Sequence, residues 1–409
     1  MTIFISILFI ILCIIIYCHE KETSIAFINA VLWTSLSLLI LLFQLPARGS
    51  AYTFVFICTV MFTVSYILVR GKRNERVLLT EAECEEQIQY NRKKYRIIIL
   101  IIAALNLVSF IFIAGSLGFK LSTFTDMGRL MARMNAVSSS RYSGDGENLP
   151  FVSRIINSIV YASMGFSGYY FVKDKSFLHI INPLIILAET VILNTKATLV
   201  FGLAFWIGGF FTGFKKMHKK IKFRYVIIVL SALTVMVLIT AGINYLRHIG
   251  TRTYFMELQA ILYSYFLGPY SAFSLWFPTY DGSMELGANT FSCVFRWLGV
   301  RAQEHGQRLD LTATSATNVY TVFKHLLNDY SYVGTVMSTA ILGVISGISM
   351  RNMGSGKESA VCVSIVINAT ILVCFFSSMF RYTTNLLACV MILTVPLIKQ
   401  FSYRGRRLL

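Results

Sequence analysis

Long apolar runs, separated by shorter polar stretches, repeat along almost the whole chain. Most runs have about seventeen or more residues, which is long enough for an α-helix to cross a hydrocarbon core of roughly 30 Å. Backbone groups in lipid must find hydrogen bonds within their own segment, so we expect each run to be helical. The pattern predicts about eleven membrane-spanning helices, over residues 2–18, 25–45, 51–70, 96–116, 151–172, 176–193, 196–214, 225–246, 332–350, 360–380 and 386–401.

The polar connections between these runs differ in charge. Residues 71–95, residues 215–224 and the C-terminal tail are rich in lysine and arginine, and all three lie on one side if every run crosses the membrane. An excess of positive charge marks the cytoplasmic side. The same alternation places two long stretches, 117–150 and 247–331, outside. We therefore predict an all-α polytopic membrane protein in which residues 1–409 form a single integral membrane domain.

Composition excludes several other classes of protein. Hydrophobic residues make up 56% of the chain, charged residues 14%, and the mean hydropathy of +0.66 is far too high for an ordinary soluble fold. The net charge of +18 would suggest a nucleic-acid partner in a soluble protein. Here the basic residues flank the apolar runs, as membrane topology requires, so we expect no nucleic acid. The eight cysteines show no paired spacing, which argues against a disulfide framework and a zinc site.

The stretch 247–331 is unlike a flexible linker, because it is rich in Tyr, Phe and Trp. Its aromatic and aliphatic repeats predict short amphipathic helices at the membrane surface. Gly268-Pro269, Pro278 and Gly282 are expected to turn these helices back on one another. Trp276 and the other aromatic residues are typical of an interfacial belt, and stacking on sugar rings is the alternative role.

Both outer stretches keep several arginines, against the charge bias expected outside the cytoplasm. Because long loops follow that bias only weakly, solvated surface charge is one interpretation. The other is an anion site, since an arginine fork matches phosphate oxygens and stays charged beside a membrane. An anionic head next to a lipid-facing wall fits a lipid-linked diphosphate sugar. Carboxylates are sparse and unpaired in both stretches, so we expect no metal and no other cofactor, with fixed cations stabilising the leaving diphosphate.

Sequence motifs make this interpretation more specific. Residues 317–324 read TNVYTVFK and residues 329–334 read DYSYVG, at the start of a predicted span. Supporting motifs are YFLGPYSAF at 265–273, GANTF at 287–291 and RYSG at 141–144, together with Arg247 just after a span. In combination these motifs resemble those of the oligosaccharide repeat unit polymerases, the Wzy-type O-antigen polymerases. The number of spans and the late, long outer stretch match that family over the whole chain.

The resemblance implies a glycosyltransferase-C-like fold and metal-independent glycosyl transfer at the periplasmic face of the bacterial inner membrane. It implies that the growing glycan passes from undecaprenyl diphosphate to the non-reducing end of the next lipid-linked repeat. The expected partners are the undecaprenyl-diphosphate-linked oligosaccharide, membrane lipid and, as a candidate, a chain-length regulator protein. Two alternatives stay open. An O-antigen ligase passes the finished glycan to lipid A core, and a flippase moves lipid-linked oligosaccharide across the membrane without chemistry.

The motifs and the charge pattern together nominate the site residues. Candidates for binding the diphosphate are Arg247, Arg252, Arg141 and Lys324. Candidates for the general base are His325, His248 and Asp329, since a histidine or carboxylate usually plays this part. Candidates for sugar contacts are Asn318 and Tyr320. Each has a structural alternative, such as a snorkelling cation or a helix cap. The family usually has arginine at the position of Lys324, so here a bidentate contact becomes a point charge.

Overall fold

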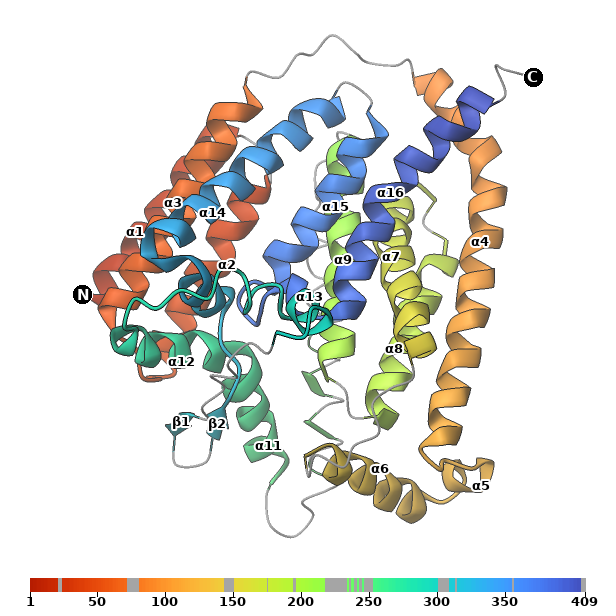
Figure 1. Cartoon of the computed structure of the whole chain (residues 1–409), viewed down its shortest axis with the longest axis horizontal. Coiled ribbons are helices and arrows are strands. Elements are labelled where there is room, and N and C mark those ends of the chain that lie inside the picture. The colour runs from red at the N-terminus through yellow and green to blue at the C-terminus, as the bar shows by residue number, and fades with distance from the viewer. Residues whose placement is uncertain are drawn as a thin grey trace.

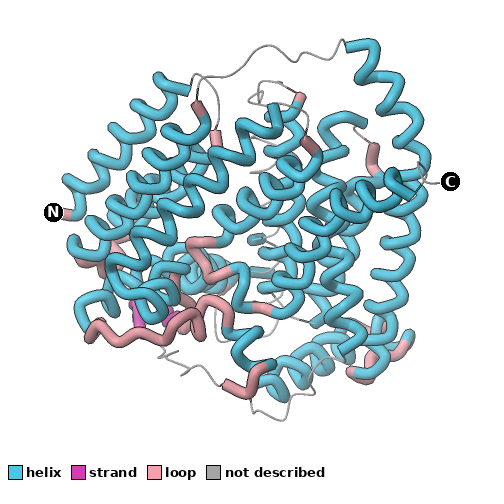
Figure 2. The backbone as a smooth tube through the Cα atoms, turned by 45° about the horizontal axis from the view of Figure 1, so that its top comes forward, coloured by secondary structure: helices cyan, strands magenta, loops and turns pink. Residues whose placement is uncertain are grey.

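The computed structural model of the chain is a bundle of helices. It describes residues 1–20, 24–71, 81–142, 151–174, 176–193, 196–217, 234, 237–238, 241–242, 245, 253–300, 309–312, 315–354 and 357–405. Figure 2 shows helices through most of this chain, with the two strands together at one edge of the bundle. The long helices are α1 (Thr2–Glu20), α2 (Ile25–Leu42), α3 (Gly49–Arg70), α4 (Glu81–Ser116), α7 (Phe151–Asp174), α8 (Leu178–Leu193), α9 (Lys196–Lys216), α14 (Val322–Gly354), α15 (Glu358–Val373) and α16 (Thr383–Gly405).

Six of the described helices are long and apolar enough to cross a membrane. They are α1, α2, α3, residues 96–116 of α4, most of α9 and α14. Shorter apolar helices occur at 178–190, 358–373 and 383–396. The prediction of an all-α membrane protein is thereby confirmed, while the count of eleven spans stays a prediction. The predicted span 225–246 lies largely outside the described residues.

The connection predicted at 71–95 is partly helical. α4 begins at Glu81, some fifteen residues before the apolar run starts near Arg96. The added segment is rich in Glu, Gln, Lys and Arg, which are good helix formers in water, so the helix extends beyond the apolar run. At this end Arg96 donates to both carboxylate oxygens of Asp174, at 3.1 and 3.2 Å. The pair joins α4 to the end of α7.

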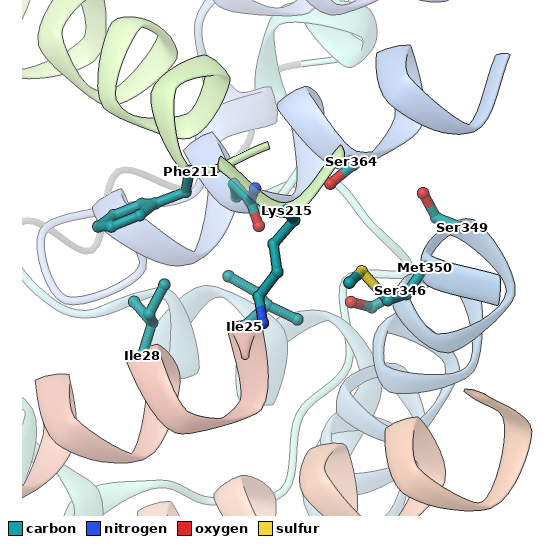
Figure 3. A pocket seen from close by; sticks show the side chains of 9 residues that line it. Ile25, Ile28, Phe211, Lys215, Ser346, Ser349, Met350 and Ser364 are labelled. Atoms are coloured by element: carbon teal, nitrogen blue, oxygen red, sulfur yellow. The ribbon is translucent and has the colours of Figure 1, made fainter. Parts of the chain in front are cut away.

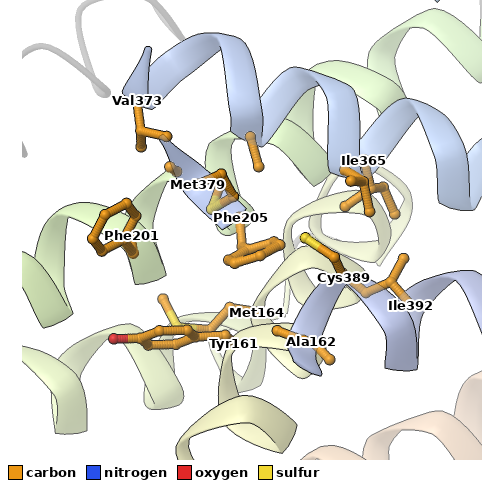
Figure 4. Close-up of a cluster of buried hydrophobic side chains, with 14 of the residues drawn as sticks. Tyr161, Ala162, Met164, Phe201, Phe205, Ile365, Val373, Met379, Cys389 and Ile392 are labelled. Atoms are coloured by element: carbon orange, nitrogen blue, oxygen red, sulfur yellow. The ribbon is translucent and has the colours of Figure 1, made fainter. Parts of the chain in front are cut away.

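The largest core lies where α7, α9, α15 and α16 meet. Figure 4 shows side chains from all four helices converging there, among them Met164, Phe205 and Ile365. α7 and α9 cross closely, because a Cβ added at Gly209 would lie 1.8 Å from the backbone oxygen of Gly165. Small residues that let helix backbones approach are a common basis of packing between membrane helices.

Short elements fill the predicted outer stretches. The first stretch contains α5 (Leu121–Phe124) and α6 (Met127–Tyr142). The second contains α11 (Tyr254–Ile261), the π-helix η1 (Leu262–Leu267), α12 (Gly268–Trp276), the 3₁₀ helix η2 (Phe277–Thr279), α13 (Ser292–Trp297), β1 (Leu309–Thr312) and β2 (Ser315–Thr317). In Figure 1 α5, α6, α11 and both strands lie at one end of the molecule, and the C-terminal end of α16 lies at the other. Elements of both stretches therefore share one end.

The chain does not reverse at Gly268-Pro269, so that prediction is wrong. α11, η1 and α12 follow one another without a break, and Pro269 occupies the first turn of α12, where its missing N–H costs nothing. Gly268 is needed for a close approach, since a Cβ there would lie 2.2 Å from the oxygen of Tyr263. Gly282 has φ of 86°, but residues 280–285 form no turn, and the chain turns at residues 286–291 instead. The antiparallel pair β1 and β2, absent from the prediction, packs beside η1, where the Thr317 hydroxyl donates to the oxygen of Ser264.

Two predicted spans have different bounds. α14 begins ten residues before the predicted 332–350 and is interrupted at Ser331, whose φ is 60° and ψ −173°. α15 ends at Val373 rather than at residue 380, and a turn leads to the 3₁₀ helix η3 (Met379–Arg381). The run after Val373 is apolar yet not helical. Protein groups satisfy its backbone, for example the Val322 N–H that donates to the oxygen of Cys374 at 2.8 Å.

Candidate functional site

Two adjacent basic residues lie in the first turn of α14, and both are buried. Lys324 is 3% exposed and His325 is 7% exposed. Strand β2 ends at Thr317, and the next four residues carry the chain into the helix. Because neighbouring side chains on a helix point about 100° apart, the two basic groups meet different partners.

Lys324 lies against two aromatic rings. Its Nζ is 3.4 Å from the ring centre of Tyr320 and 5.0 Å from that of Trp276 in α12. A cation over ring faces is stabilised, and more so where water is excluded. Burial raises the pKa of Tyr320 to about 12, so the phenol is neutral at pH 7. Neither ring carries a charge that would neutralise the ammonium group.

The two predicted sugar contacts differ in exposure. Asn318 is exposed, between β2 and α14, and does not cap α14, which begins at Val322. Tyr320 is 5% exposed, with its ring against Lys324. In this geometry the Asn318 side chain is accessible to a sugar, whereas the Tyr320 ring packs against Lys324 and positions it.

His325 contacts an arginine from a distant part of the chain. Its Nε2 is 3.5 Å from Nη1 of Arg381 in η3. A guanidinium has donors only, so Nε2 must accept with its lone pair, and the imidazole in this contact is neutral. The lone pair that a general base needs therefore points at Arg381. This geometry supports a positioning role for His325, and its predicted role as a base stays untested.

Asp329 anchors a turn. Its side chain is 0% exposed, and Oδ1 accepts hydrogen bonds from the backbone N–H and the side-chain amide of Asn289, both at 2.9 Å. Oδ2 accepts from the backbone N–H of Thr290 at 2.6 Å. Gly287, with φ of 98°, allows the chain to turn there. The predicted role of Asp329 as a base stays untested, and the contacts support an anchoring role.

The anchored turn leads into α13, whose first two residues contact η3. The hydroxyl of Ser292 donates to the backbone oxygen of Arg381 at 3.2 Å. The thiol of Cys293 donates to the backbone oxygen of Phe380, also at 3.2 Å. Asp329 therefore fixes the turn, and the turn fixes the backbone of Arg381 beside His325.

An apolar cavity of about 390 Å³ borders this cluster. It lies among α2, α3, α14 and α15, and its lining includes Val322, Leu326 and Phe380. Val322 is two residues before Lys324, and Phe380 directly precedes Arg381. The basic cluster thus lies near one end of the cavity, although none of its three basic side chains lines it.

Several predicted residues cannot be placed beside this cluster. Arg247, His248 and Arg252 lie outside the described residues. Arg141 belongs to α6, whose backbone is described there, but the position of its side chain is not. α6 itself packs against α8. Of the predicted set, the structure brings together Lys324, His325, Asp329 and Tyr320.

Arg381 was missing from the predicted set. The sequence alone could have identified this residue. The short connection after the span predicted at 360–380 falls on the outer side, and a lone arginine there opposes the charge bias. Only the early end of α15 shows that residues 374–382 fold back against α14.

The arrangement can hold an anion beside an apolar surface. Among the described residues, no three His, Cys, Asp or Glu side chains lie close enough together to hold a metal ion. Comparisons of the chain with protein family models, with curated proteins and with solved structures found no match.

Proposed function

We propose that the protein is an oligosaccharide repeat unit polymerase of the bacterial inner membrane. It transfers the growing glycan from undecaprenyl diphosphate to the non-reducing end of the next lipid-linked repeat, at the periplasmic face and without a bound metal. Eleven spans in a glycosyltransferase-C-like arrangement belong to the same proposal. The TNVYT motif favours this activity over that of a ligase.

One observation carries the proposal. Lys324, His325 and Arg381 gather near an apolar cavity, and Lys324 lies against Trp276 of the second predicted outer stretch. A flippase is expected to place its charged groups along a central cavity. Basic groups at one end of an apolar cavity instead suit a substrate with an anionic head and an apolar tail.

The chemistry requires stabilisation of a leaving diphosphate. The acceptor hydroxyl oxygen forms a bond to the anomeric carbon as the bond from that carbon to the diphosphate oxygen breaks. The bonding electrons leave with the diphosphate, whose added charge Arg381 and Lys324 stabilise. His325 keeps Arg381 in place, and Asn318 contacts the sugar. The acceptor proton passes to a base, for which His248, outside the described residues, stays the predicted candidate.

Replacing the arginine tests the proposal. In a strain lacking the chromosomal copy, Arg381→Ala should slow polymerisation by about 100-fold, as expected when one fixed group that stabilises transition-state charge is lost. Gel electrophoresis of the surface glycan should then show lipid A core with a single repeat in place of a ladder. The matched control is Arg129→Ala, which removes an exposed arginine of α6 that pairs with Asp126 at 3.2 Å.

Two outcomes would contradict the proposal. A normal ladder in the strain that lacks the protein would exclude polymerisation by this chain. Core without any repeat, together with long glycan still attached to its lipid, would identify a ligase. Membrane fractionation of each variant shows whether the substituted protein is inserted.

A further inference from the structure

The cavity beside the basic cluster is lined by apolar surface even where its residues are polar. The hydroxyl groups of Thr59, Ser338 and Thr370 each donate to a backbone oxygen four residues earlier in their own helix, at 2.8 to 2.9 Å. Their hydrogen-bonding capacity is therefore used within the helices. The remaining lining is dominated by aliphatic and aromatic side chains from α2, α3, α14 and α15.

The cavity contains an unsatisfied polar group at the end near the basic cluster. Thr290, which lines the cavity, is 5% exposed, and its hydroxyl has no hydrogen-bond partner in the described part of the chain. Leaving a buried hydroxyl without a partner is unfavourable, because the group has lost its hydrogen bonds to water. Thr290 is also the residue whose N–H is held by Asp329, so its backbone has a fixed position. Its hydroxyl is therefore available to donate to a polar group bound at this end of the cavity.

From that end the cavity extends deep between the helices. Its lining on α14 continues from Val322 to Ile345. The part of α14 after Ser331 alone covers about 20 Å at a rise of about 1.5 Å per residue, which is well over half of a hydrocarbon core of roughly 30 Å. A volume of about 390 Å³ is sufficient for a small-molecule ligand, for which sites span about 300–1,000 Å³. The cavity thus has the length and volume to hold part of a long chain.

One edge of the cavity opens toward lipid. Ile341 and Ile345 of α14 line it and are nevertheless 55% and 42% exposed. A chain longer than the cavity could therefore leave sideways between α14 and its neighbours. A smaller cavity lies beyond Ile345, with Lys215 and Ser346 among its lining residues, as Figure 3 shows. Its volume of about 20 Å³ admits one water molecule, so it does not extend the apolar path.

We propose that this cavity binds the isoprenoid tail of a polyprenyl diphosphate, with its first isoprene units between α3 and α14 and its diphosphate at Thr290 and Arg381. The identity of the head group rests on the function proposed above. Charge complementarity selects the occupant, because the basic cluster at one end requires an anion and the lining requires a long apolar chain. The same complementarity favours a diphosphate over the single negative charge of a phospholipid phosphodiester.

Photolabelling tests the proposal directly. The purified full chain in lipid nanodiscs is irradiated with a polyprenyl diphosphate that carries a diazirine in an early isoprene unit, and labelled peptides are identified by mass spectrometry. Label is expected on the cavity segments of α3 and α14, around residues 58–62 and 338–345. Leu342→Trp and Ser338→Trp, which fill the cavity, should each lower this labelling at least 10-fold. Met337→Trp, at a position 58% exposed and outside the lining, is the matched control.

The possible results separate this proposal from the proposed function. Label spread evenly over the exposed faces of α1 and α4 overturns the tail site. So does equal labelling of the cavity by a diazirine phosphatidylglycerol that unlabelled polyprenyl diphosphate fails to displace.

If the glycan ladder depends on the protein but either of these results is seen, only the tail site is wrong. If the cavity is labelled as expected while the strain lacking the protein makes a normal ladder, the tail site stands and polymerisation is wrong. Size-exclusion profiles confirm that each tryptophan variant folds.

Discussion

At the residue scale, His325 shows how a contact restricts chemistry. Sequence makes every histidine in an outer stretch a candidate base, because the free imidazole titrates near neutral pH. In the structure, the Nε2 lone pair accepts from Arg381, which has donors only. A side chain used in this way orients a cation more readily than it removes a proton.

Substitution of His325 separates the two roles. Glutamine keeps an acceptor oxygen for Arg381, so we expect His325→Gln to retain at least about one third of the polymerisation rate, and His325→Leu to lose about 10-fold, since about 1.4 kcal/mol corresponds to a factor of ten. The rate should be measured against pH for each variant. A role as general base predicts the opposite, namely that glutamine is as damaging as leucine and that the acidic limb of the wild-type profile disappears in both.

At the scale of elements, Asp329 joins three parts of the chain that are distant in sequence. It lies on α14, holds the turn before α13, and through that turn fixes η3. Three donors converge on one buried carboxylate, and hydrogen bonds to a charged group contribute about 1.5–3 kcal/mol. The turn and η3 therefore take their positions from α14 rather than from their own sequence.

Replacing Asp329 should lower stability as well as activity. In Asp329→Asn the amide nitrogen faces a backbone donor that the carboxylate used to accept from, so we expect a loss of about 1.5–3 kcal/mol and a lower temperature of unfolding. Limited proteolysis should cut faster between residues 280 and 300. Unchanged thermal stability and proteolysis with lost activity would assign Asp329 to catalysis instead.

The crossing of α7 and α9 gives a second prediction at this scale. Gly209→Val adds a side chain where a Cβ would lie 1.8 Å from the Gly165 oxygen, so the helices must separate. We expect a loss of at least about 3 kcal/mol, at the upper end of the cost of overpacking. The control is Gly115→Val in α4, where nothing lies within 4 Å of an added Cβ. Detergent-solubilised protein, heated and then analysed by size exclusion, should aggregate early only in the first variant.

At the scale of the whole molecule, the two ends of the bundle differ. Helices α5, α6 and α11 and both strands, all from the predicted outer stretches, lie at one end, and the end of α16 lies at the other. Labelling with a membrane-impermeant maleimide tests which end faces outward. A cysteine at Leu298, which is 72% exposed, should react in intact spheroplasts, and the exposed Cys18 at the end of α1 should react only after lysis. The reverse pattern would show that the positive-inside argument assigns the wrong side.

The sequence by itself determined what depends on local pattern. Apolar runs predicted the helices because lipid leaves the backbone no other hydrogen-bonded state, and clustered lysines and arginines predicted which connections share a side. The TNVYT motif led to Lys324 and His325. Local pattern also led to wrong predictions at Gly268-Pro269 and at the end of α15. Hydropathy does not show whether a helix continues through a Gly-Pro pair, or whether an apolar segment leaves the helix and packs against protein.

Only the tertiary structure decided how the candidate groups work. It brought Arg381 to His325 across more than fifty residues, placed Tyr320 under Lys324, and bound both oxygens of Asp329 to a turn. It also showed an apolar cavity beside the basic cluster. These are contacts between segments distant along the chain. Hydropathy and charge report the environment that each residue prefers, whereas the direction of a lone pair and the space between helices depend on which partners packing brings together.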